Sequence, residues 1–175
     1  MRATSGRPEQ AAHHIQSFPN SCQPACVAMA LARRGIGTVA HIEARLHVDA
    51  DAAGHSATER KWLNEPQTSL LKSTLDAEEL NGLRQAIARG AWVMIHVFGP
   101  RWVARFPTGV SGPHGPLCAP ADAAFSLHAV LLVASGPACF FVLDPFSSAD
   151  LQPLEVSDAE LLLVLAGFAS LVVER

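Results

Sequence analysis

Apolar and polar positions divide the chain into helical stretches followed by short β-rich runs. The apolar runs 92–98, 128–135 and 139–144 are bounded by turn residues and rich in branched and aromatic side chains, as is typical of buried strands. Helix-start and helix-stop residues predict helices over 21–34, 38–48, 75–90 and 156–167, with a last strand over 169–173. Helices first, then a mostly antiparallel sheet with one late helix, predict an α+β fold.

Capping residues set the predicted helix ends. Asn20 or Ser21 is expected to cap the first helix, and Gly35 is expected to end it. The helices over 75–90 and 156–167 share a signature in which a capping residue is followed three positions later by a glutamate that closes a capping box. These boxes are predicted at Asp76 with Glu79 and at Ser157 with Glu160, and Gly90 and Gly167 are expected to end the two helices.

Three stretches lack such patterns. Residues 49–74 are mixed and polar and predict a loop with at most one helical turn. Residues 99–126 are rich in glycine and proline and predict a long irregular loop, a feature that is often functional in a compact domain. Residues 1–14 predict a flexible arm, and no role is expected for His13 and His14 within it.

Composition indicates one folded domain, predicted over 15–175. Of the 175 residues, 49% are hydrophobic and 17% are charged, and the net charge is −3. Lys and Arg form no cluster, which argues against a nucleic-acid partner. The N-terminal residues contain no apolar segment, so no signal peptide is expected. The apolar stretches 128–135 and 160–173 are shorter than the roughly 18 residues of a spanning helix. No membrane span and a cytoplasmic location are therefore expected.

Cys22 is the first candidate for chemistry, because it lies at or just before the start of the first predicted helix. Unpaired N–H groups and the helix dipole favour a thiolate there, as for a nucleophilic cysteine. The alternative is a buried, inert thiol. The four cysteines, Cys22, Cys26, Cys118 and Cys139, are irregularly spaced and do not suggest a disulfide framework. A zinc or redox site is conceivable, but the spacings match no common pattern, so neither metal nor cofactor is predicted.

His128 and Asp144 are predicted to lie side by side. His128 begins one strand of the expected hairpin and Asp144 closes the other, so a carboxylate would orient an imidazole. Taken separately, each residue is equally consistent with a structural role. Gln16 lies six residues before Cys22, and its amide N–H could reach an oxyanion formed at that thiol.

Other polar and aromatic residues have weaker indications. His114, in the glycine- and proline-rich loop, could line a cleft, and Trp102 could be a cleft wall or a core residue. His96 lies inside a predicted strand and is expected to be a hydrogen-bonded core histidine. Cys26 follows Cys22 by one helical turn and is expected to be a packing neighbour of it.

The residues around Cys22 resemble a known family. "Q-SFPNS-C-QPACVAM" and the later "HAVLLV…FFVLDP" are similar to papain-like cysteine peptidases. They are most similar to the double-glycine leader peptidases of bacteriocin-exporting ABC transporters and to their stand-alone or toxin-domain relatives. That family has Gln, a five-residue gap, and then Cys-Gly-x-Ala-x-Leu-x-Met, and Gln16, Cys22, Ala25 and Met29 hold the matching positions. The likeness spans residues 16–173.

The resemblance implies a papain-like α+β fold, with N-terminal helices packed on the sheet, and thiol-protease chemistry. His128 would take the proton of Cys22, Asp144 would orient His128, and Gln16 with a backbone N–H would stabilise the oxyanion. Gln23 stands where the family has glycine. Its larger side chain is expected to contact substrate, to narrow the cleft and to affect substrate choice.

The implied function is that of a bacterial cysteine endopeptidase that cleaves a protein or peptide after small residues such as Gly-Gly. It would be either a free-standing processing protease that works with export machinery, or an interbacterial toxin protease. The toxin would be delivered into a target cell without a classical signal peptide and opposed by an immunity protein. Two alternatives stay open: a phytochelatin-synthase-like acyl or peptide transferase, and a non-catalytic peptide-binding module.

Overall fold

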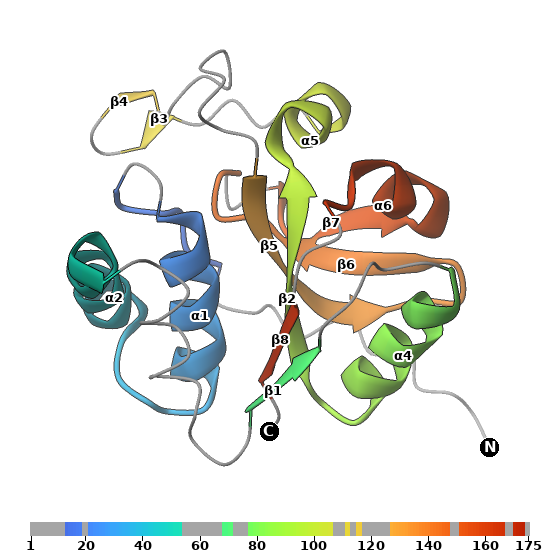
Figure 1. Cartoon of the computed structure of the whole chain (residues 1–175), viewed down its shortest axis with the longest axis horizontal. Helices are drawn as coiled ribbons and strands as arrows, with labels where there is room; N and C mark the ends of the chain where they lie inside the picture. The colour runs from blue at the N-terminus through green and yellow to red at the C-terminus, as the bar shows by residue number, and fades with distance from the viewer. Residues whose placement is uncertain are drawn as a thin grey trace.

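Helices cover both faces of a central antiparallel sheet (Figure 1). This computed structural model describes residues 13–18, 21–53, 68–71, 77–106, 111–112, 115–116, 127–147, 151–166 and 170–173. Every neighbouring pair in the sheet is antiparallel. In spatial order the strands are β1 (Thr68–Leu71), β8 (Ser170–Val173), β2 (Trp92–Phe98), β5 (Leu127–Ser135), β6 (Cys139–Leu143) and β7 (Leu154–Ser157).

The helices divide between the two faces of this sheet (Figure 1). One face packs against α1 (Cys22–Arg33), and α2 (Val39–Ala53) packs on α1. The other face packs against α4 (Ala77–Ala88), α5 (Gly99–Arg105) and α6 (Asp158–Val164). The α+β class and the packing of the N-terminal helices on the sheet are therefore confirmed.

Strand β2 shows how the sequence produces two cores. Successive side chains of a strand point to opposite faces of the sheet. Trp92 and Met94 accordingly join the core under α1, whereas Val93, Ile95 and Val97 join the core under α4 and α5. All five are at most 5% exposed, so the strand is buried on both faces, which explains its continuous apolar run.

The predicted helix ends are confirmed at Gly35 and Gly90, whereas α2 runs past residue 48 to Ala53 and α6 ends at Val164, before Gly167. Gly35 and Gly90 follow α1 and α4 with φ of 77° and 93°, a backbone conformation that favours glycine. At α6, Ser157 Oγ accepts from the Glu160 N–H while Glu160 Oε2 accepts from the Ser157 N–H, which is the predicted capping box. Ser21 holds the N-cap position of α1, but its side chain caps nothing. The box predicted at Asp76 lies outside the described residues.

Two loop predictions are wrong in part. Within 99–126, Gly99–Arg105 forms α5, because Pro100 stands in the first turn, where its missing N–H costs no helical hydrogen bond. The same stretch contains the short pair β3 (Ser111–Gly112) and β4 (Gly115–Pro116). Within 49–74, α2 continues to Ala53 and β1 pairs with β8, a partner that lies far along the chain. Local polarity does not indicate such a distant partner.

Among the described residues, no helix combines the length and the apolar character needed to cross a bilayer.

Candidate active site

Cys22 is the first residue of α1 and is 8% exposed. The first N–H groups of a helix have no acceptor within the helix, so they form a site for negative charge. The Ser21 side chain does not cap them, and its hydroxyl instead lies 2.7 Å from Glu43 Oε1 and 2.8 Å from the Phe18 carbonyl oxygen. The thiol therefore lies beside uncapped backbone donors at the start of a buried helix.

His128 and Asp144 are in direct contact. His128 is in β5, where it pairs with Val97 of β2, and Asp144 directly follows β6. Because β5 and β6 pair as an antiparallel hairpin, the start of one strand lies beside the end of the other. His128 Nε2 is 2.8 Å from Asp144 Oδ1, and the residues are 6% and 0% exposed. The predicted contact is confirmed.

Asp144 is held as a carboxylate by three donors. Its Oδ1 accepts from His128 and from the Phe146 N–H at 2.8 Å, and its Oδ2 accepts from the indole N–H of Trp102 at 2.8 Å. Burial alone would raise the pKa of Asp144, but the charge of His128 and these hydrogen bonds outweigh burial and hold that pKa below its ordinary value. A buried negative charge therefore faces His128.

The environment of His128 favours the imidazolium. Burial lowers its pKa, but the Asp144 charge and hydrogen bond, followed by a hydrogen bond and charge interaction with Cys22, raise it to about 10. Cys22 is thus close enough to His128 to affect the pKa of the ring. The Phe146 ring meets His128 edge-on at 6.0 Å between centroids. A thiol, an imidazole and a carboxylate therefore lie close together, and we call Cys22, His128 and Asp144 the Cys22–His128–Asp144 row.

Gln16 lies in the segment that leads to this row. It is 3% exposed, its backbone N–H donates to the Pro145 carbonyl at 2.9 Å, and its Nε2 donates to the Phe18 carbonyl at 3.0 Å. A carbonyl oxygen only accepts, so the amide nitrogen must face Phe18. Because an amide nitrogen carries two N–H groups, one remains after this bond. Gln16 is therefore packed beside the turn that follows Asp144, with donor capacity left.

Gln23 extends from α1 to the sheet. Its side-chain nitrogen is bonded to Nε2 of His96 in β2, and both residues are half-buried. His96 is thus hydrogen-bonded, as predicted, and its partner is the residue next to Cys22. Gln23 directly follows Cys22 in the chain, and its side chain is fixed to the sheet by this bond. That Gln23 narrows the cleft stays a prediction.

The remaining predictions about site residues have mixed outcomes. Trp102 is 0% exposed, which contradicts a role in lining the substrate cleft, because its ring is enclosed in the core and its N–H is bound to Asp144. His114 lies outside the described residues. Cys26 is fully buried, and its thiol donates to the Ala129 carbonyl at 3.5 Å, as expected of a packing neighbour. In the described part of the chain, no three His, Cys, Asp or Glu side chains are grouped to hold a metal.

His13 and His14 are bound to the protein, which contradicts the expectation that they have no role. His13 Nε2 donates to the Asp144 carbonyl at 2.8 Å, and burial holds the pKa of His13 below its ordinary value. His14 Nε2 is 2.5 Å from Oε2 of Glu43, which is 0% exposed. Glu43 was missed because it is one polar position in a helical pattern, and nothing in its spacing distinguishes it from a solvent-facing glutamate.

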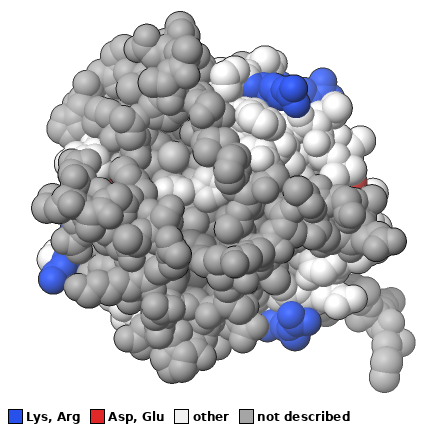
Figure 2. Space-filling model, viewed as in Figure 1, with Lys and Arg blue, Asp and Glu red and all other residues white. Residues whose placement is uncertain are grey.

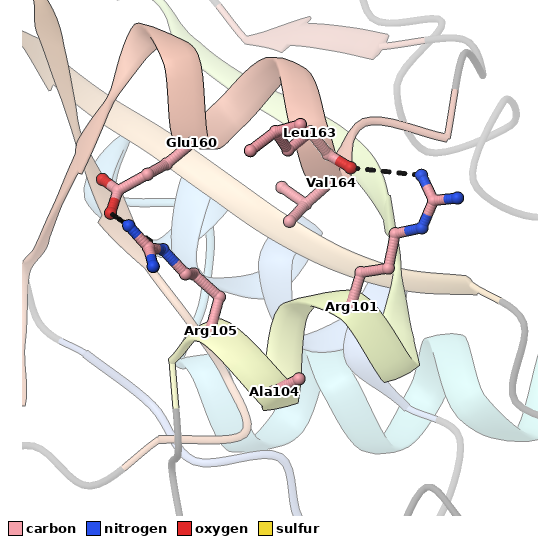
Figure 3. Close-up of a pocket in the computed structure, with 6 residues that line it drawn as sticks. All are labelled: Arg101, Ala104, Arg105, Glu160, Leu163 and Val164. Atoms are coloured by element: carbon pink, nitrogen blue, oxygen red, sulfur yellow. Dashed lines mark hydrogen bonds and ion pairs between the residues drawn. The ribbon is translucent and has the colours of Figure 1, made fainter.

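The surface charge and a groove between α5 and α6 involve other residues than Cys22, His128 and Asp144. On the face shown in Figure 2, the Lys and Arg side chains of the described residues lie at separate points, one over α5, and form no continuous basic surface. Figure 3 shows a groove of about 490 Å³ between α5 and α6. Its two arginines are already engaged: Arg105 pairs with Glu160, and Arg101 Nη1 donates to the Leu163 carbonyl at 3.3 Å.

Comparison with known proteins identifies the fold. No protein-family model matches the chain, and no curated protein matches it in sequence. A crystal structure from Bacillus anthracis, provisionally named a C39-like peptidase, superposes with a TM-score of 0.60 over 96% of this chain and 97% of that one. The chain has the fold of this C39-like peptidase. The two sequences are 14% identical, so the likeness concerns the fold. It confirms the papain-like α+β class.

Proposed function

We propose that the chain is a cysteine endopeptidase whose nucleophile is Cys22. The observation that carries the proposal is the position of His128, which contacts Asp144 through Nε2 and interacts with Cys22. A thiolate paired with an imidazolium is the reactive form of a catalytic cysteine. The likeness in fold to a C39-like peptidase also supports the proposal. It comes from the structure, and is thus separate evidence from the residue pattern around Cys22.

The proposed roles follow from the chemistry of amide cleavage. His128 takes the Sγ proton of Cys22, and the thiolate attacks the carbonyl carbon of the substrate. The oxyanion that forms accepts hydrogen bonds from Gln16 and from a backbone N–H at the start of α1. The C–N bond then breaks as His128 returns the proton to the leaving amine. Water, deprotonated by His128, cleaves the thioester and restores the thiol.

Asp144 is proposed to act on His128 and not on substrate. Its carboxylate orients the ring and stabilises the imidazolium. Trp102 and the Phe146 N–H hold that carboxylate in place. The acid is thereby fixed before substrate binds.

We further propose that substrate is cleaved after small residues, with Gly-Gly as the leading candidate. This preference rests on the similarity of the Gln16–Met29 pattern to that of double-glycine leader peptidases. The tethered side chain of Gln23 beside Cys22 is consistent with a narrow cleft. The biological setting would be either the processing of exported peptides or the attack of a toxin protease on a target cell, the latter opposed by an immunity protein.

Thiol alkylation tests the nucleophile. Iodoacetamide at neutral pH should modify Cys22 faster than the other three cysteines, and His128→Ala should remove this difference. Cys139 is a useful reference because burial and the nearby Glu155 carboxylate raise its pKa. Labelling of Cys22 at the rate of Cys139 would contradict the thiolate–imidazolium pair.

A search for new protein N-termini tests activity and substrate together. Cells expressing the wild type should contain cleaved N-termini that are absent from cells expressing Cys22→Ala, and the residues before each cut should be small. Products joined to an amine in place of water would instead indicate a transferase. Peptide binding without any Cys22-dependent product would indicate a binding module.

A further inference from the structure

The carboxylate of Glu43 joins the two ends of the loop that separates Gln16 from Cys22. Glu43 Oε1 accepts from the Ser17 N–H and from the Ser21 hydroxyl, each at 2.7 Å. Ser17 directly follows Gln16, and Ser21 directly precedes Cys22. Glu43 Oε1 therefore contacts both the residue after Gln16 and the residue before Cys22, and it holds these two ends of the loop together.

Glu43 is both buried and charged. It is 0% exposed and lies in α2, which packs beside α1. Burial alone would raise the pKa of Glu43, but hydrogen bonds from His14, Ser21 and Ser17 outweigh it and hold that pKa below its ordinary value. An ionised carboxylate without partners would be costly at such a site. The loop supplies those partners, so the conformation of the loop and the charge of Glu43 depend on each other.

The segment before this loop is also held from the side of Asp144. The Gln16 N–H donates to the Pro145 carbonyl at 2.9 Å, and His13 donates to the Asp144 carbonyl at 2.8 Å. His14, between them, is bound to Glu43. Residues 13–17 therefore connect α2 to the turn that carries the acid, and Gln16 is held on both sides.

The hydroxyl of Ser21 connects Glu43 to the start of α1. Ser21 is at the N-cap position, where a serine side chain ordinarily accepts from the helix N–H groups. Here the side chain makes no such bond and instead contacts Glu43. The backbone donors beside Cys22 therefore have no side-chain cap, which leaves them for an incoming anion.

We infer that Glu43 is a positioning residue, which holds Gln16 and the backbone donors at Cys22 in the geometry that stabilises an oxyanion. The inference rests on the proposed function and deepens it. The inference predicts different effects on two reactions of the Cys22 thiol. Both reactions need the Cys22 thiolate, but only acylation by an ester also passes through an oxyanion that these donors stabilise, whereas alkylation by iodoacetamide forms no oxyanion. The ratio of the two rates therefore reports the oxyanion contribution.

The test therefore compares p-nitrophenyl acetate with iodoacetamide at Cys22, using Cys22→Ala as the background. Glu43→Ala should lower the acylation-to-alkylation rate ratio by about tenfold or more, since small displacements of catalytic groups have effects of this size. Glu43→Gln keeps an oxygen that can accept from Ser17 and Ser21, so it should largely restore the ratio. Leu83→Ala, a core change under the opposite face of the sheet, should destabilise the protein and leave the ratio unchanged.

Hydrogen exchange of the peptide covering residues 14–22 provides a readout that does not depend on peptidase activity. Glu43→Ala should speed exchange there, Glu43→Gln should not, and Ser21→Ala is the substitute if Glu43→Ala does not fold. Unchanged exchange in both Glu43→Ala and Ser21→Ala would overturn the inference, as would faster exchange with an unchanged rate ratio. If wild-type Cys22 is acylated no faster than Cys139, the proposed function fails, and exchange still reports whether Glu43 holds the loop.

Discussion

Trp102 donates its indole N–H to Oδ2 of Asp144 at 2.8 Å, across 42 positions of sequence. The tryptophan belongs to α5, and the aspartate directly follows the hairpin strand β6. Both residues are 0% exposed. The side chain of Trp102 is therefore closed to solvent and supports the carboxylate of Asp144, which faces His128.

Trp102→Phe tests this support. It keeps an aromatic ring beside Phe106 but removes the N–H, so the free energy of unfolding should fall by about 1.5–3 kcal/mol, the size of a hydrogen bond to a charged group. Urea denaturation measures this change. Alkylation of Cys22 should also slow, because Asp144 would hold His128 less firmly.

Trp92→Phe is the matched control for this change. Trp92 is 5% exposed and packs in the core under α1, where Arg33 lies 4.3 Å from its ring centroid. The Trp92→Phe variant should be less stable because the smaller ring fills less of this core. The alkylation rate of Cys22 should be unchanged. Equal effects of the two substitutions on alkylation would argue against a specific role for the indole N–H of Trp102.

The His128–Asp144 pair predicts a pH-dependent contribution to stability. The pKa of His128 is raised from 6.5 to about 10, so its stabilisation is complete below pH 6.5 and is lost as the pH rises through about 10. The pKa of Asp144 is lowered from 3.8, so its stabilisation is complete above pH 3.8 and is lost as the pH falls through the folded-state value. Both contributions are complete only between pH 3.8 and 6.5.

Asp144→Asn should therefore cost the most stability near the middle of that range. Urea unfolding of wild type and Asp144→Asn at several pH values should give a difference that is largest between pH 3.8 and 6.5 and shrinks toward pH 10. A difference that grows as the pH rises above neutrality would show that the pair is not an imidazolium with a carboxylate.

Gln23→Gly should widen the space beside Cys22. The change removes the side chain tethered to His96, so a bulky reagent such as N-phenylmaleimide should gain severalfold in rate relative to iodoacetamide. Glycine in a helix also costs up to about 1 kcal/mol of stability. His96→Ala removes the tether but keeps the bulk of Gln23, and it should therefore give a smaller gain. An unchanged rate ratio in Gln23→Gly would mean that Gln23 does not limit access.

Ser157→Ala tests a feature far from the thiol. It removes the capping box of α6, so the free energy of unfolding should fall by about 0.5–2 kcal/mol. The Ser157 bonds are the largest of the causes that lower the pKa of Glu160 to about 2, so this pKa should rise in the variant. The alkylation rate of Cys22 should not change, and a loss of reactivity would indicate coupling between α6 and the site.

Local patterns were sufficient to predict most of the elements and the central contact of the site. Strand β2 was predicted with its observed ends because a strand buried on both faces has a continuous apolar run with clear boundaries. The contact between His128 and Asp144 was predictable because the two residues flank one short hairpin, so their proximity follows from a local connection.

By itself the sequence determined the helices and strands with regular periodicity, the place of Cys22 at a helix start and the hairpin that pairs His128 with Asp144. Only the tertiary structure decided which residues bind Asp144 and the loop before Cys22. Trp102 donates a hydrogen bond to Asp144, and Glu43 accepts hydrogen bonds from Ser17 and Ser21. Periodicity indicates that a position is buried, but it does not indicate what the position is buried against. A glutamate or tryptophan acquires its role only when distant elements pack around it and remove water from its polar atoms.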